Sequence, residues 1–85
     1  MTWSLRIAGR VKKALDKVPD KDQRLIRSAL ELMRTDPFSG DIKRLKNDRA
    51  AWRRRIGNYR VFFDVYPDTF IVDVVAIVRR TSTTY

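Results

Sequence analysis

Residues 52–65 read WRRRIGNYRVFFDV, and this stretch decides the fold. Two strand-like runs flank Gly57-Asn58, a dipeptide that suits the two-residue loop of a β-hairpin with glycine first. Side chains of a strand alternate between its two faces, so Arg53 and Arg55 are expected to leave the same face. The same pairing sets Arg55 opposite Arg60, a destabilising like-charged pair that a bound anion would relieve.

Two helices are expected ahead of this hairpin, after a short strand at residues 3–8. Apolar positions in residues 10–18 follow the i, i+3, i+4, i+7 spacing of an amphipathic helix, which a proline then ends. Asp20 and Gln23 are spaced as in a capping box, which marks the start of a second helix. That helix ends at TDP, residues 35–37, because the residue before a proline is pushed out of the helical region.

The second half of the chain has the pattern of an antiparallel meander, with strands expected at residues 42–46, 51–56, 59–66 and 70–78. A two-residue turn at Pro67-Asp68 would set Asp64 opposite Ile71 and Arg60 opposite Val75. One face then collects apolar residues for the helices to cover: Tyr59, Val61, Phe63, Val65, Phe70, Val72, Val74, Ala76 and Val78.

These elements predict one α+β domain over residues 1–85, in the order β-α-α-β-β-β-β. Its N-terminal helical hairpin would pack on one face of a mainly antiparallel, twisted sheet.

The charge balance favours a polyanionic partner. Of 85 residues, 19 are Lys or Arg and 10 are Asp or Glu, for a net charge of +9. The absence of Cys and His excludes disulfides, thiol nucleophiles, the usual zinc ligands and the commonest general base. No run of about 18 apolar residues exists to span a bilayer, and the N-terminus lacks the apolar core of a signal peptide. We therefore expect a cytoplasmic protein without membrane contact.

The predicted open face of the sheet collects Arg53, Arg55, Arg60 and Arg79. The segment from Ile42 to Arg60 holds one acid, Asp48, among eight basic residues: Lys43, Arg44, Lys46, Arg49, Arg53, Arg54, Arg55 and Arg60. Ordinary surfaces mix both signs, so the segment predicts binding of a phosphate polymer, although any single arginine can be a solvated surface residue. Strand alternation sends Arg54 toward the helical side instead.

Cleavage of an RNA backbone needs an aligned 2′-hydroxyl, charge stabilisation at the phosphate and proton transfer at both ends. Arginines supply the first two but are poor bases. Lys43 or Lys46 would act as the base only if neighbouring arginines favoured its neutral form, and either is otherwise a phosphate contact. Tyr85 is a candidate stacking platform or proton donor, unless the chain end is frayed. Asp64 and Asp73 are expected to form salt bridges with arginines.

Three stretches resemble the RelE/ParE superfamily of toxins from toxin–antitoxin pairs: GDIKRLKN at 40–47, WRRRIGNYRVFFDV at 52–65 and IVRRTSTTY at 77–85. The resemblance implies a cytoplasmic toxin that a cognate, RelB-like antitoxin wraps and neutralises. Its RelE branch implies a ribosome-dependent mRNA endoribonuclease that inhibits translation. Cleavage would proceed by 2′-hydroxyl attack on the adjacent phosphate, with ribosome and mRNA as partners and no metal or cofactor.

Matching positions of the RelE branch imply the catalytic candidates Arg53, Arg55, Arg60, Arg79, Arg80 and Tyr85. The other basic residues of the segment are candidate nucleic-acid contacts: Lys43, Arg44, Lys46, Arg49 and Arg54. Well-known RelE toxins carry lysines at the positions of Arg53 and Arg55, which leaves the general base open. Two alternatives stay open: a ParE-like poison of DNA gyrase without nuclease activity, and a non-toxic nucleic-acid-binding module.

Overall fold

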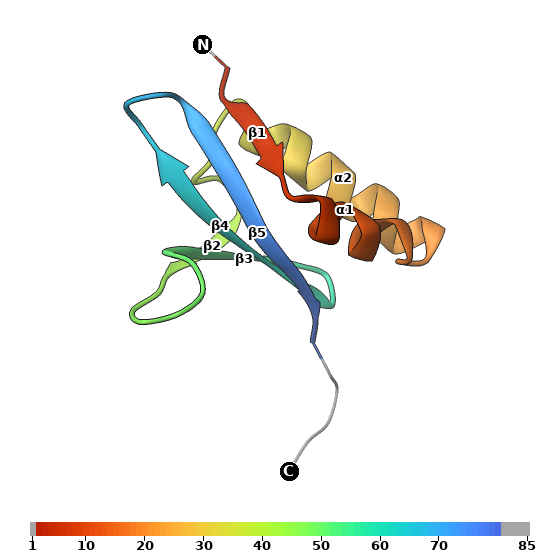
Figure 1. Cartoon of the computed structure of the whole chain (residues 1–85). Coiled ribbons are helices and arrows are strands. Elements are labelled where there is room, and N and C mark those ends of the chain that lie inside the picture. Colours follow the sequence, from red (N-terminus) through yellow and green to blue (C-terminus); the bar gives the residue numbers. More distant parts are fainter. Residues whose placement is uncertain (1, 81–85) are drawn as a thin grey trace.

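The computed structural model describes residues 2–80. Its elements are β1 (Ser4–Ile7), α1 (Gly9–Asp16), α2 (Asp20–Met33), β2 (Asp41–Arg44), β3 (Trp52–Ile56), β4 (Tyr59–Tyr66) and β5 (Ile71–Arg79). The strands form one sheet in the order β1-β5-β4-β3-β2, in which β1 is parallel to β5 and the other pairs are antiparallel. Figure 1 shows both helices on one side of this twisted sheet. The predicted α+β class and element order are confirmed.

The β3–β4 hairpin has the predicted register. Ile56 pairs with Tyr59, and Arg55 pairs with Arg60. Gly57 begins the loop with φ +57, a left-handed conformation that glycine adopts without a steric penalty. A two-residue loop leaves no freedom to slide the strands, so the alternation of faces along β3 follows directly from the sequence.

The turn between β4 and β5 is longer than predicted. It covers residues 67–70 and ends on Phe70, whose φ of 54 places it in the left-handed region. The predicted pairing of Asp64 with Ile71 is therefore wrong, because Asp64 stands opposite Asp73.

A β-bulge in β5, opposite residues 62–63, shifts the register a second time. The extra residue reverses the alternation of faces in the rest of the strand. Ile77 consequently packs against the core, whereas Val78, predicted to be a core residue, is exposed. Val78 also stands opposite Arg60, in place of the predicted Val75.

The core lies between the helices and the sheet. It contains Val11 and Leu15 of α1, several residues of α2, and the predicted strand residues Tyr59, Val61, Phe63, Val72 and Val74. Phe70 is exposed in the turn and contacts Trp3, with ring centroids 5.0 Å apart. The helices thus cover one face of the sheet, and the other face is free to form a site.

The predicted capping box at the start of α2 is wrong. Pro19 is the N-cap, and Asp20 already belongs to the first turn, where its negative charge suits the helix dipole. The Gln23 side-chain amide donates to the Val18 carbonyl in the loop between the helices at 3.3 Å, and to the carbonyl of Asp16, the last residue of α1, at 3.5 Å. Within residues 2–80, neither helix is long and apolar enough to cross a membrane.

Candidate functional site

A cleft of about 230 Å³ lies on the face of the sheet opposite the helices. Its lining residues are Lys43, Leu45, Asp48, Arg53, Arg60 and Phe62. Lys43 comes from β2, Arg53 from β3 and Arg60 from β4, so three neighbouring strands each contribute one cation. With three cations and one carboxylate, Asp48, among its lining residues, the cleft carries net positive charge, which suits an anion.

Arg53 is the most enclosed cation of this cleft, with 14% of its side chain exposed. It stands between Lys43 on one neighbouring strand and Phe62 on the other. Its Nη1 is buried and has no hydrogen-bond partner among residues 2–80. An unpartnered buried donor is costly, and an anionic oxygen that reached it after a shift of the shielding side chains would satisfy it with a charge-assisted hydrogen bond.

Arg55 leaves β3 on the same face, directly opposite Arg60 as predicted. The like-charged pair has a partial counter-charge in Asp41, which stands opposite Arg55 on β2. The Asp41 carboxylate lies 3.6 Å from Arg55 Nε and 3.7 Å from Arg53 Nη1. Sequence reasoning missed Asp41, because its place depends on the β2–β3 register.

The loop between β2 and β3 closes one side of the cleft. Arg49 places its guanidinium 4.9 Å from the centre of the Phe62 ring, in a cation–π contact. The Ala51 amide donates to the Asp64 carboxylate at 2.8 Å and holds the end of the loop on β4. Asp64 therefore anchors a loop, and within residues 2–80 it does not form the predicted salt bridge. Asp73 does pair with an arginine, Arg6, at 3.1 Å.

Two further predicted nucleic-acid contacts lie outside the cleft. The guanidinium carbon of Arg44 lies 5.1 Å from the centre of the Trp52 ring. Strand alternation places this pair on the opposite face from Lys43. Lys46 is exposed in the loop after β2 but does not line the cleft.

Arg54, a predicted nucleic-acid contact, is buried with 7% exposure and so is not presented on the surface. Its Nη1 donates to the Ser39 hydroxyl at 3.1 Å and to the Ala29 carbonyl at 3.4 Å. Burial lowers the pKa of this guanidinium, and the nearby Asp36 partly offsets that effect. Arg54 thus fastens the end of α2 and the following loop to β3, which explains an arginine that alternation sends to the helical side.

The bulge in β5 changes the expected position of Arg79. Arg79 stands opposite Tyr59, a core residue, and so leaves the predicted open face. Arg80 follows it, and its amide donates to the Asn58 carbonyl at 2.6 Å. Arg80 lies just past the end of β5, and the alternation of that strand, if continued by one residue, would send its side chain toward the face of Arg60. Tyr85 lies outside the described residues.

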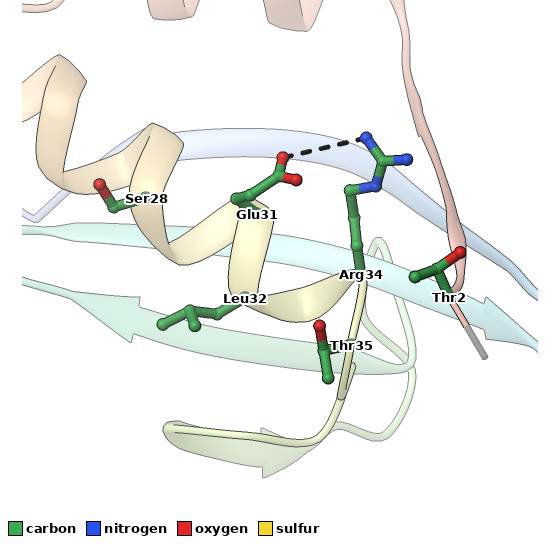
Figure 2. Close-up of a pocket in the computed structure, with 6 residues that line it drawn as sticks. All are labelled: Thr2, Ser28, Glu31, Leu32, Arg34 and Thr35. Carbon is green, nitrogen blue, oxygen red and sulfur yellow. Dashed lines mark ion pairs between the residues drawn. The ribbon is translucent and has the colours of Figure 1, made fainter.

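A second hollow, of about 500 Å³, lies at the C-terminal end of α2 and is shown in Figure 2. Its lining residues are Thr2, Ser28, Glu31, Leu32, Arg34 and Thr35. Leu32 is 59% exposed, and Leu25, two turns earlier on α2, is 49% exposed. The charged rim includes Glu31 and Arg34, whose side chains approach to 3.9 Å. An apolar surface beside a hollow is typical of a protein-binding site.

The chain matches the family model described as the ParE toxin of the type II toxin–antitoxin system parDE, over residues 3–83. It is also 34% identical over 83 residues to the candidate toxin RelE1 of Methanocaldococcus jannaschii, a match that covers 94% of this chain and 92% of that one. The chain therefore belongs to the RelE/ParE superfamily of toxins from type II toxin–antitoxin systems.

Its relatives place it in the RelE-like branch of that superfamily. The archaeal RelE–RelB complex from Pyrococcus horikoshii matches with a TM-score of 0.83 and 23% identity, over 98% of this chain and 100% of that one. The RelB–RelE antitoxin–toxin complex from Methanococcus jannaschii matches with a TM-score of 0.66 and 26% identity, over 87% of this chain and 88% of that one. Both are structures of a RelE in complex with a RelB.

Proposed function

We propose that this toxin arrests translation as a ribosome-dependent mRNA endoribonuclease. The observation that carries the proposal is the buried, unpartnered Nη1 of Arg53 in a cleft that also holds Lys43 and Arg60. Asp48 is the one carboxylate among the lining residues against three cations, and a backbone phosphate would supply further negative charge and acceptor oxygens. A ribosomal target would place the activity in the cytoplasm.

The reaction would join the 2′-oxygen to phosphorus and break the bond to the 5′-oxygen, which leaves a 2′,3′-cyclic phosphate. Arg53 and Arg60 would stabilise the charge on the phosphoryl oxygens as it develops. One group must take the 2′-hydroxyl proton, and another must protonate the leaving 5′-oxygen. Lys43 lines the cleft and Lys46 does not, so Lys43 is the better candidate for the first role. Roles for Arg55, Arg79, Arg80 and Tyr85 stay predictions from the resemblance.

A second function is favoured by one observation, the match to a family model named for ParE. In that case the protein would poison DNA gyrase through a protein–protein contact and would cut no RNA. The basic cleft would then be a binding surface for an acidic partner.

The deciding experiment maps mRNA 5′ ends by primer extension after brief expression of the toxin. We expect cuts inside translated codons, and a matched mRNA whose start codon is removed should stay intact because ribosomes do not read it. Purified toxin should leave gyrase supercoiling unchanged. Intact mRNA with arrested growth and inhibited supercoiling would instead assign the gyrase function. Unaffected growth would favour a non-toxic binding module.

We also propose that the outer face of α2 is part of the binding surface for a RelB-like antitoxin. Leu25 and Leu32 are exposed on it, and Leu32 lines the hollow at the end of the helix (Figure 2). The solved relatives with their bound RelB support this choice of partner. An antitoxin segment with an apolar side chain for the hollow and acidic residues around it would also match the net charge of +9.

Leu32→Asp is expected to weaken binding of the cognate antitoxin at least about tenfold, because it places a charge in an apolar contact. Titration calorimetry with the purified antitoxin would measure the change. Thr69→Asp is the matched control, since it adds one carboxylate to the exposed β4–β5 turn and should leave affinity unchanged. Wild-type affinity in Leu32→Asp would exclude this face of α2 from the interface.

A further inference from the structure

The Asp41 carboxylate lies close to both arginines of β3 on the open face, Arg53 and Arg55. Asp41 Oδ1 lies 3.7 Å from Arg53 Nη1, and Oδ2 lies 3.6 Å from Arg55 Nε. Each oxygen thus faces one guanidinium, at a distance too long for a hydrogen bond. The Asp41 side chain is 57% exposed. The carboxylate therefore offsets part of the charge of the two arginines without being tightly held.

The position of Asp41 follows from the sheet register. Asp41, Arg55 and Arg60 form one row across β2, β3 and β4. The acid stands at the outer end of two like-charged side chains, whose repulsion it reduces. Two oxygens that share one negative charge are also what a phosphodiester offers through its non-bridging oxygens. The carboxylate and an RNA phosphate would therefore compete for the same guanidiniums.

We propose that Asp41 is an internal substitute for the RNA phosphate. It offsets part of the positive charge of Arg53 and Arg55 in the free protein, and a backbone phosphate displaces it when RNA binds. The identity of the anion rests on the proposed function, whereas the competition rests on the geometry of the three side chains.

Displacement of Asp41 by a phosphate is favoured because the carboxylate leaves a hydrogen-bond donor of Arg53 without a partner. Arg53 Nη1 stays without a hydrogen-bond partner within the described part of the chain, even though Asp41 lies nearby. Nη1 is shielded from solvent, so a phosphate oxygen would reach it only once Asp41 and the surrounding side chains move aside, and it would then form the missing charge-assisted hydrogen bond at about 2.8 Å. The exposed Asp41 side chain can return to water at little cost. Asp41 thus lowers the affinity for anions while it stabilises the free cleft.

The test compares Asp41→Asn with wild type, using a 12-nucleotide 2′-O-methyl RNA that cannot be cut by 2′-hydroxyl attack. Fluorescence anisotropy at low salt should show about two- to fivefold tighter binding by Asp41→Asn, the range expected from losing exposed ion pairs. Asp68→Asn is the matched control, because it removes the same charge from the β4–β5 turn. It should bind the RNA as wild type does.

Thermal unfolding supplies an independent readout. In chloride buffer Asp41→Asn should unfold at a lower temperature than wild type, because its arginines repel each other without a counter-charge. Inorganic phosphate should raise the Tm of Asp41→Asn more than that of wild type, since a ligand that binds the native state stabilises it.

Several results would overturn the proposal. They are equal or weaker RNA binding by Asp41→Asn, an equal gain in Asp68→Asn, and equal stabilisation of wild type and Asp41→Asn by phosphate. The probe is not cleavable, so these results do not depend on nuclease activity. If the toxin cuts no mRNA but Asp41→Asn binds the RNA more tightly, the proposed function is refuted. The competition between Asp41 and a phosphate for the arginines would still be supported.

Discussion

Arg53→Met is expected to cut mRNA at least about a hundredfold more slowly than wild type, the loss typical of removing one charge-stabilising donor from an active site. Methionine keeps the unbranched apolar stem beside Phe62 but removes the charge and every donor, including the unpartnered Nη1. Single-turnover cleavage of a short mRNA on programmed ribosomes, with purified toxin in excess, measures this step without product release.

Arg24→Met is the matched control for that experiment. It makes the same chemical change at an exposed position of α2, away from the cleft, so the cleavage rate should stay within about twofold of wild type. Antitoxin binding by Arg53→Met should also be retained, which would show that the variant is folded. Cleavage at the wild-type rate would exclude Arg53 from the reaction and remove the main support for the nuclease proposal.

The cations of the cleft were predictable because a short loop ties two strands together. Gly57-Asn58 allows one register only, and strand alternation then sends Arg53, Arg55 and Arg60 to one face. Residues 70–78 offered no such constraint. Their continuous β-branched and apolar pattern suits either face, so neither the left-handed Phe70 nor the bulge can be read from it.

The missed residues depend on contacts that are distant in the chain. The β2–β3 register places Asp41 beside the arginines. That register depends on how the loop at residues 45–51 folds, and a loop of this length has no simple turn type that fixes it. Alternation did place Arg54 on the helical side, but its partners Ala29 and Ser39 come from a helix and a loop. Sequence periodicity describes single elements, whereas these positions depend on how elements meet.

Gly40→Ala is expected to destabilise the fold by about 2 to 4 kcal/mol, from left-handed strain and overpacking together. Gly40 has φ +80, a conformation that disfavours any side chain. An added Cβ would lie 2.7 Å from Nη2 of Arg54 and 2.8 Å from its Cζ. The guanidinium cannot easily move away, because it is buried and donates to Ser39. Chemical denaturation would measure the change in unfolding free energy.

Gly9→Ala is the control for the general effect of replacing glycine. A Cβ at Gly9 meets no atom within 4 Å in the described part of the chain, and the residue opens α1, so stability should change by less than about 1 kcal/mol.

The double variant Gly40→Ala with Arg54→Met separates the two causes of the loss. If the guanidinium is the obstacle, the two substitutions should couple by at least about 1 kcal/mol, because the second removes the clash created by the first. Simple additivity would assign the whole loss to backbone strain, and Arg54 would then not be packed against the loop as tightly as these distances require.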